Sequence, residues 1–455
     1  MKNKALTQTV LRIALPAVAE LILTSLTQFV DTIMVGKIGH HAISAVGLTT
    51  QPRFIMLSVF VALNVGTTAL VARFKGQENK DDAALVSMQA LLLTLVSAII
   101  LTIPGVLFSR HMVVFMGADA ETVREATGYF RILMLGFTPT ALSLVISALL
   151  RGVGDTKISM RYNIAANIIN IIFNYFLIYG KWGFPELGVN GAALATVLGN
   201  TIACGMAFYA ISGKRRKKNR KKNVSDFIEL RFTRKNCLPD FLMLKRIIKI
   251  GLPAAGEQFA LRAGLLIYTI TITSLGTKVF AAHQIVLVIL NLSFVNGQAF
   301  GIAAATLSGQ ALGRKEPDRA KESARVCQHI GSLISTVMGI GMFVFRKYLM
   351  LLFTADEEII LLGAQIMILV ALLQPFQSAF QIYAGALRGA GDSLYPAISL
   401  SVGILIIRPA LSYVFINVVG AGLFGAWCAL FIDQFVRFIM IRLRFKAGKW
   451  ISLKV

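Results

Sequence analysis

Residues 214–222 read Lys-Arg-Arg-Lys-Lys-Asn-Arg-Lys-Lys, which is eight cations in nine positions. Apolar sequence of helical length lies on both sides of this basic run. A block of like charges cannot enter hydrocarbon, and loops rich in Lys and Arg stay on the cytoplasmic side of a membrane. The basic run therefore predicts the orientation of the neighbouring spans and divides the chain into two halves. A patch that binds nucleic acid or anionic lipid is the alternative interpretation.

The composition excludes an ordinary soluble protein. The chain of 455 residues is 56% hydrophobic and only 15% charged, which is typical of stacked membrane spans. Its net charge of +24 is concentrated in every second connection, on the side of the basic run. By the positive-inside rule both termini are cytoplasmic and the number of spans is even. The cations on that side are Lys2, Lys4, Arg12, Arg73, Lys75, Lys80, Arg151, Lys157, Arg161, Arg314, Lys315, Arg319, Lys321, Arg325, Arg388, Arg442, Arg444, Lys446 and Lys449.

Apolar runs between charged or Gly/Pro-rich breaks predict twelve spans, six on each side of the basic run. The first contains Glu20 and Asp31, unlike a cleaved signal, so we expect it to remain as a span. Four widely separated cysteines predict no disulfide framework. The predicted spans are 10–36, 43–72, 83–108, 121–150, 156–180, 188–212, 243–275, 279–311, 321–345, 357–387, 393–419 and 422–445.

The two halves repeat each other at one constant offset in the numbering, the offset that relates Glu20 to Glu257. At the same offset Arg151-Gly152-Val153-Gly154-Asp155 returns as Arg388-Gly389-Ala390-Gly391-Asp392. Six spans per copy is an even number, so both copies cross the membrane in the same sense. The prediction is an all-α membrane protein with twelve transmembrane helices in two pseudo-symmetric six-helix lobes around a central cleft. The predicted parts are the N-terminal lobe 1–213, a basic cytoplasmic linker 214–242 and the C-terminal lobe 243–455.

The Arg-Gly-x-Gly-Asp repeats lie in cytoplasmic connections. Their glycines permit a tight turn, and we expect the Asp of each repeat to cap the helix that follows.

Two predicted spans carry polar stripes of identical spacing. Glu20, Thr24, Thr27 and Asp31 are 4, 3 and 4 residues apart, which places them on one helical face with Gln28 at its edge. The fifth span repeats this spacing with Asn163, Asn167, Asn170 and Asn174. Acids at membrane depth are functional candidates by default. The amides are interpreted either as hydrogen bonds between helices or as support for the ionisable Asp31.

The second copy is chemically different. Glu257 remains, but Tyr268 stands at the position of Asp31, so ion coupling is predicted in the N-terminal lobe alone. His283 and Gln284 are candidates to line a cavity. No His-Glu-x-x-His, Gly-x-Ser-x-Gly or phosphate-loop motif occurs in the chain. Arg262 and Arg408 also lie inside predicted spans, and the sequence suggests no role for either.

Several of these motifs together are similar to a known family. Val30-Asp31-Thr32-Ile33-Met34-Val35-Gly36 with Gly39, the Leu-Pro openings of spans one and seven, Ala281-Ala282-His283-Gln284 and both Arg-Gly-x-Gly-Asp turns resemble the multidrug and toxic compound extrusion (MATE) transporters, in a NorM-like or DinF-like branch. The resemblance covers nearly the whole chain. Some members carry Asp where this chain has Asn174, and a tenth-span acid of NorM-type members has no clear match here.

The resemblance implies efflux of cationic or amphipathic organic compounds in exchange for H⁺ or Na⁺, by alternating access between the lobes. It implies no cofactor and no enzymatic activity. Asp31, Asn170, Asn174 and Thr27 are the expected ion-coupling residues, with Asp31 as the position for Na⁺ if that ion is used. Substrate contacts are expected from Gln28, Glu20, Glu257, Tyr268, His283 and Gln284.

The expected setting is the plasma or inner cell membrane. We expect a monomer that contacts membrane lipids and has no nucleic-acid partner. A single clear carboxylate supports protons somewhat more than sodium, because a site with two acids would neutralise sodium better.

Three alternatives remain open on the sequence alone. A major-facilitator carrier also has parallel six-span repeats, but its charged loop after the second span is not what residues 72–77 show. A flippase for a lipid-linked precursor shares the broader fold. A membrane-embedded enzyme would turn over substrate in detergent without any gradient.

The orientation can be tested with Cys237, which lies in the basic linker. We expect a membrane-impermeant maleimide to leave Cys237 unlabelled in intact cells and to label it after permeabilisation, because the cations of the basic run stay cytoplasmic. Labelling of Cys237 in intact cells would refute this orientation. A variant with the other three cysteines replaced serves as the background.

Overall fold

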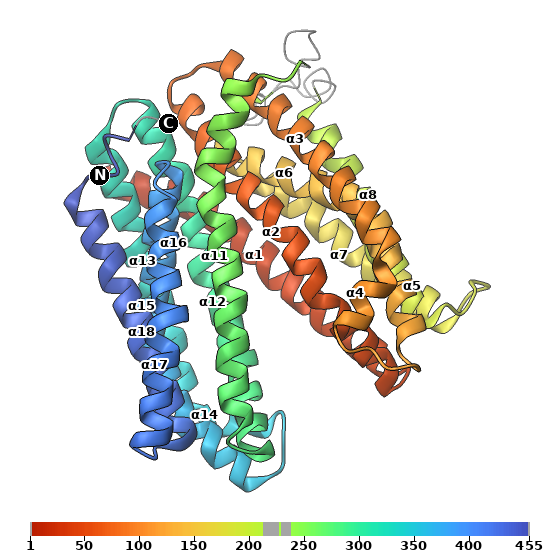
Figure 1. Cartoon of the computed structure of the whole chain (residues 1–455). Coiled ribbons are helices and arrows are strands. Elements are labelled where there is room, and N and C mark those ends of the chain that lie inside the picture. Colours follow the sequence, from red (N-terminus) through yellow and green to blue (C-terminus); the bar gives the residue numbers. More distant parts are fainter. Residues whose placement is uncertain (1, 213–226, 229–237, 454–455) are drawn as a thin grey trace. The chain divides into compact units, whose positions relative to one another are not determined.

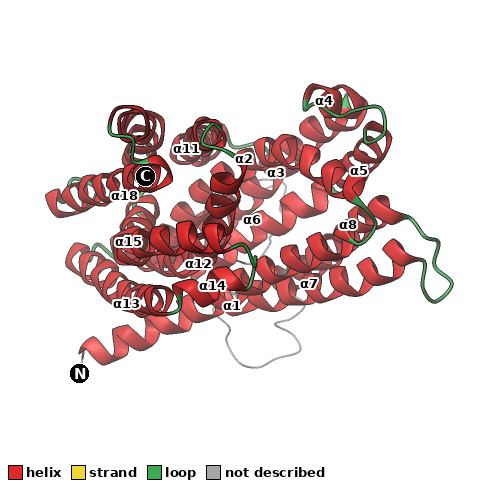
Figure 2. Cartoon of the chain, turned by 90° about the horizontal axis from the view of Figure 1, so that it is seen from below, coloured by secondary structure: helices red, strands yellow, loops and turns green. Residues whose placement is uncertain are grey.

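The computed structural model describes residues 2–212, 227–228 and 238–453. The basic run and Cys237 lie outside these residues. Helices and loops make up the described part, which contains no strand (Figure 2). Helices suit the apolar composition, because in hydrocarbon each backbone polar group must be satisfied within its own segment.

The first half of the chain forms eight described helices (Figure 1). They are α1 (Lys2–Gly36), α2 (His40–Gly76), α3 (Lys80–Leu107), α4 (Ser109–Phe115), α5 (Val123–Leu135), α6 (Phe137–Val153), α7 (Thr156–Tyr179) and α8 (Gly188–Ile211).

The second half repeats this order (Figure 1). Its elements are α11 (Phe241–Thr273), α12 (Thr277–Gly313), α13 (Pro317–Val344), α14 (Arg346–Leu351), α15 (Glu357–Gly389), α16 (Leu394–Val402), η2 (Gly403–Ile407), α17 (Arg408–Tyr413), η3 (Val414–Val418) and α18 (Gly422–Ala447). The short helices α4 and α14 begin at Ser109 and Arg346, which are equivalent positions of the repeat.

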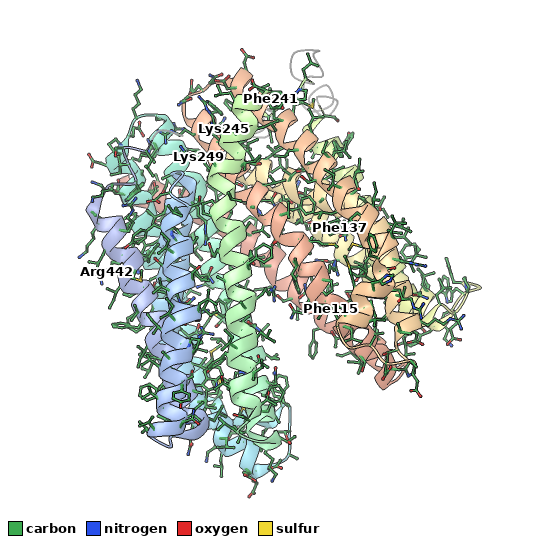
Figure 3. All side chains as sticks on the ribbon, in the orientation of Figure 1. Phe115, Phe137, Phe241, Lys245, Lys249 and Arg442 are labelled. Carbon is green, nitrogen blue, oxygen red and sulfur yellow. The ribbon has the colours of Figure 1, made fainter. Side chains whose placement is uncertain are left out.

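Ten of the described helical segments are long and apolar enough to cross a membrane, and the bent pair α5–α6 makes an eleventh. α11 coincides with the remaining predicted span and is 33 residues long. In its first turns Phe241, Lys245 and Lys249 are exposed (Figure 3).

Two predicted spans are not the single regular helices expected. The fourth is bent by 49° between α5 and α6, at Gly136. A Cβ there would overlap Val197, and Pro139 removes a backbone donor in the first turn of α6, so both residues favour a break. The eleventh span contains two π-helical segments, η2 and η3, on either side of α17.

Contacts divide the described chain into two units. One comprises residues 1–18 and 252–455, and the other residues 19–251. Both α1 and α11 therefore contribute to each unit, and the division falls next to Pro16 and Pro253, which are equivalent in the repeat. The division into lobes at the basic linker stays a prediction.

Equivalent helices pack together within each unit. α6 packs on α2 and α3, and α7 packs on α8. In the other unit α15 packs on α12 and α13, and α17 packs on α18. The core of that unit also includes Val10, Ile13 and Ala14 from the start of α1, buried with Phe300 and Leu387.

The Arg-Gly-x-Gly-Asp turns are tight, as predicted. Gly154 and Gly391 have φ of 90° and 94°, which favours glycine. The predicted capping role is wrong. Asp155 occupies the N-cap position of α7 without a side-chain capping bond, and the carboxylate of Asp392 accepts from Arg444 at 2.8 Å.

Gly385 tests the close packing of α12 on α15. A Cβ at Gly385 would overlap the carbonyl oxygen of Gly301. We expect Gly385→Ala to lower the free energy of unfolding by about 1–3 kcal/mol, measured by thermal unfolding in detergent. Gly341→Ala is the control, because a Cβ there meets no atom within 4 Å. Equal stability of the two variants would contradict this packing.

Candidate functional site

Four pairs of positions align α1 with α7. The separation of 143 residues relates Glu20 to Asn163, Thr24 to Asn167, Thr27 to Asn170 and Asp31 to Asn174. Hydrogen bonds join three of these pairs: Asn163 Nδ2 donates to Glu20 Oε1 at 2.9 Å, Asn167 Nδ2 to Thr24 Oγ1 at 3.3 Å, and Asn174 Nδ2 to Asp31 Oδ1 at 2.5 Å. A constant separation means that the two helices run parallel in one register. The two polar stripes have equal spacing in the sequence, and this allows them to match position by position.

Asp31 is held by two amides. Asn174 is fully buried and donates to Oδ1 of Asp31. Asn170 is also buried, and hydrogen-bond geometry favours the orientation in which its nitrogen donates to the same Oδ1 at 2.9 Å. Its oxygen then accepts from the backbone N–H and the hydroxyl of Thr196. Three of the four predicted ion-coupling residues therefore form one hydrogen-bonded group.

The fourth predicted residue contributes less. Thr27 is buried on the same face of α1, but its hydroxyl donates to the carbonyl oxygen of Leu23 at 2.9 Å. Gln28 is exposed at the edge of that face.

Asp31 has no ion-pair partner among the described residues. The side chains that interact with it electrostatically are Arg53 of α2 and Tyr129 of α5, neither of which lies within ion-pair distance. The other acid of α1, Glu20, is already neutralised. Arg151 Nη2 donates to Glu20 Oε1 at 2.7 Å, and Ser159 donates to Oε2 at 3.2 Å.

The ion pair is repeated in the second copy. Arg388 Nη2 donates to both oxygens of Glu257, at 2.6 and 2.7 Å. In each copy the Arg follows the Glu at the same separation along the chain. This repetition is visible in the sequence, but the ion pairs were not predicted from it. Glu20 and Glu257 thus hold the Arg-Gly-x-Gly-Asp turns to α1 and α11. Their predicted contact with substrate stays a prediction.

The four asparagines of α7, which we call the asparagine ladder, are absent from the second copy. The positions equivalent to the four asparagines are Leu400, Ile404, Ile407 and Leu411. Where Asp31 would be, Tyr268 is buried and donates to the carbonyl oxygen of Ala426 at 2.9 Å.

His283 is fully buried, and neither ring nitrogen has a hydrogen-bond partner in the described part of the chain. Its ring packs against Tyr268 and Trp427, with centroids 5.5 Å apart in both pairs. Gln284, the neighbouring candidate, is exposed.

Sequence reasoning missed one charged group altogether. Arg408, which had no assigned role, pairs with Asp433 of α18, and Arg437 binds the same carboxylate. The only sequence signal was the spacing of four between Asp433 and Arg437 on one helix.

A family model described as MatE matches residues 16–176 and 253–414. The two matches begin at equivalent positions of the repeat, because residues 16 and 253 are the prolines that open spans one and seven. This chain belongs to the MatE family. It is therefore a membrane transporter and not an enzyme, and the family resemblance and the twelve-helix fold predicted from the sequence are confirmed.

Similar proteins span almost the same length. The probable multidrug resistance protein NorM of Thermotoga maritima is 29% identical over 440 residues, covering 97% of this chain and 92% of that protein. The uncharacterized transporter YisQ of Bacillus subtilis is 29% identical over 437 residues, covering 93% and 90%.

Solved structures share the fold. An outward-facing multidrug resistance MATE family transporter of the MOP superfamily has a TM-score of 0.88 at 22% identity, covering 98% of this chain and 97% of its own. A MOP superfamily transporter from Pyrococcus furiosus has a TM-score of 0.87 at 23% identity, with the same coverage.

The repeated ion pair provides a stability test. Arg151→Gln leaves the Glu20 carboxylate buried without its cation, so we expect a loss of about 3 kcal/mol in the free energy of unfolding. The double variant with Glu20→Gln removes that unpaired charge and should recover most of the loss. The exposed pair Arg319–Glu316 is the control, and Arg319→Gln should cost at most about 1 kcal/mol. A double variant as unstable as Arg151→Gln would contradict the pairing.

Proposed function

We propose that this chain exports cationic or amphipathic organic compounds, drugs among them, across the cell membrane in exchange for a proton carried by Asp31. The single observation that carries the proposal is the carboxylate of Asp31, which is bonded by two buried amides and lacks an ion-pair partner among the described residues. The name of the Thermotoga maritima relative, a probable multidrug resistance protein, supports the substrate class.

The balance of charges favours Asp31 over Glu20 as the residue that carries the exchanged proton. An acid that is already paired with an arginine gains little from a second cation, and Arg151 has this effect on Glu20. Arg53 interacts electrostatically with Asp31 but forms no ion pair with it, so a proton or a cationic compound can neutralise the carboxylate of Asp31. The two compete for one carboxylate, and that competition is what an antiporter requires.

The two amides suit a group that changes its charge. Both donate to Oδ1 of Asp31, and Oδ2 has no hydrogen-bond partner in the described residues. A proton on Oδ2 would leave both donated bonds in place, because the amides bond to the other oxygen. Little hydrogen bonding is then lost when Asp31 alternates between its two states.

The same geometry favours a proton over sodium. A sodium ion would need several oxygen ligands around Asp31, but the oxygen of Asn170 already accepts from Thr196. The remaining ligands would have to come from groups such as the unpartnered oxygen of Asn174 and the hydroxyl oxygen of Thr27, which donates its proton to Leu23. Sodium coupling is the competing proposal, and it predicts transport driven by a sodium gradient alone.

We propose that transport proceeds by alternating access of the substrate site to the two sides of the membrane. We propose that residues 1–213 rock against residues 243–455, with the linker 214–242 in the cytoplasm and both termini on the same side. The parallel repeat supports this, because transporters with such repeats commonly move one repeat against the other. Gln28, Tyr268, His283 and Gln284 are the proposed substrate contacts, and the protein is proposed to act as a monomer among membrane lipids.

The test is Asp31→Asn, which keeps the shape of the side chain and removes its charge. In proteoliposomes with an imposed pH gradient, we expect wild-type protein to accumulate a cationic dye and Asp31→Asn to lose at least nine-tenths of that activity. A further arm imposes a sodium gradient at constant pH, where we expect no accumulation.

Asp318→Asn is the matched control, because Asp318 is an exposed acid at the start of α13. It should transport like wild type. Accumulation by Asp31→Asn against the gradient would disprove coupling at Asp31, and transport driven by sodium alone would disprove the proton assignment.

A further inference from the structure

A second charged group lies inside the apolar bundle of α17 and α18. Nε and Nη2 of Arg408 donate to Oδ2 of Asp433 at 2.9 and 2.7 Å, and Nη2 of Arg437 donates to the same oxygen at 2.7 Å. Asp433 is completely buried, and each arginine is 4% exposed. We call these three residues the arginine cluster.

The arginine cluster carries one surplus positive charge. Two arginines share one carboxylate, and an arginine stays protonated in proteins. Glu257 is the next acid that interacts electrostatically with Arg437, but it already pairs with Arg388. Counted together, three cations face two carboxylates. A surplus charge at membrane depth is costly and marks a functional site by default.

Hydrogen-bonding groups at the cluster are left unpaired. Nε of Arg437 and Oδ1 of Asp433 have no partner among the described residues. Buried polar groups are paired in the great majority of cases, so an unpaired guanidinium nitrogen beside a surplus cation points to an absent acceptor. An anion supplies an acceptor for Nε of Arg437 and the missing negative charge, whereas Oδ1 of Asp433 is itself an acceptor and is not satisfied by an anion.

Three aromatic side chains pack in a row beside the cluster, and the last of them has an unpaired N–H donor. The guanidinium of Arg408 lies 5.2 Å from the ring centre of Tyr268, which packs against His283, and His283 packs against Trp427. The indole N–H of Trp427 has no partner in the described part of the chain. An aromatic compound with an anionic group would thus meet rings as well as cations.

The backbone is shaped to allow this arrangement. Gly403 begins the π-helical segment η2, directly before α17, and a Cβ there would overlap Oδ1 of Asp433 and lie 2.7 Å from Cδ of Arg437. Glycine at this position permits the side chains of α18 to reach the eleventh span. π-Helical segments are rare and occur frequently at functional sites.

We propose that the arginine cluster binds the carboxylate of a transported organic compound that also carries a cationic group. This inference rests on the proposed export function and narrows its substrate class. Arg437 provides the surplus charge, because Arg408 and Asp433 alone form a neutral pair. The chemistry is that of a charge-assisted hydrogen bond between a guanidinium and a carboxylate.

The experiment compares a rhodamine that carries a free carboxylate with its methyl ester, which has the same cationic ring system. Binding of each dye to the purified full chain is measured in detergent by fluorescence anisotropy. We expect wild type to bind the carboxylate form roughly tenfold more tightly than the ester. Arg437→Gln should reduce this ratio to about one, and Arg437→Lys should keep part of it.

Arg442→Gln is the matched control. Arg442 lies on the same helix, is exposed and is labelled in Figure 3. It should keep the wild-type ratio. If Arg437→Gln fails to fold, Arg408→Gln is used instead. It removes one cation, and Asp433 keeps its ion pair with Arg437 on the same helix. A ratio that is the same in wild type and the cluster variants overturns the inference.

Two further arms separate the possible sources of failure. In the first arm, thermal unfolding is measured with and without acetate. If acetate stabilises wild type but not Arg437→Gln, and wild type binds both dyes equally well, the cluster binds a free anion and the inference is overturned. Transport of the ester in proteoliposomes tests the proposed function by itself. Wild type that transports the ester but shows no carboxylate preference overturns only the inference, whereas failure to transport either dye overturns the proposed export.

Discussion

The register between α1 and α7 fixes the geometry of the site. Amides of α7 donate to oxygens of α1 at a constant separation of 143 residues, and these bonds satisfy polar groups that apolar surroundings would otherwise make costly. A shift of either helix by one residue would turn the asparagines away from the acids. The register that satisfies the polar side chains of both helices therefore also places Asp31 against Asn170 and Asn174.

Duplication preserved the architecture and changed the chemistry. Each copy keeps a Glu–Arg ion pair between the first helix and the Gly-rich turn, at one and the same separation along the chain. Around it the two copies differ. The first has an asparagine ladder with an acid that lacks an ion-pair partner among the described residues, and the second has aliphatic residues at the ladder positions, with two arginines on one carboxylate. One unit thus offers a negative charge and the other a positive charge, each inside its own helices.

Much of this was predictable because it depends on periodicity. Helical spacing along two segments is enough to identify the faces of Asp31 and Asn174, and one offset is enough to identify the repeat. The pairing of Arg408 with Asp433 was not predictable in the same way, since it depends on how two helices are rotated against each other and on Gly403 at their contact. The bend at Gly136 and the role of Asp392 likewise depend on neighbours distant in sequence, Val197 and Arg444. Local propensity carries no information about such partners.

The proposed exchange of a proton for a cationic compound takes place at the carboxyl group of Asp31, where it can be observed directly. The measurement is difference infrared spectroscopy of the purified protein, recorded before and after addition of a cationic dye. We predict that a protonated-carboxyl band is lost and a carboxylate band is gained in wild type, and that neither change occurs in Asp31→Asn. An unchanged carboxyl region in wild type, or the same change in the variant, would contradict the exchange.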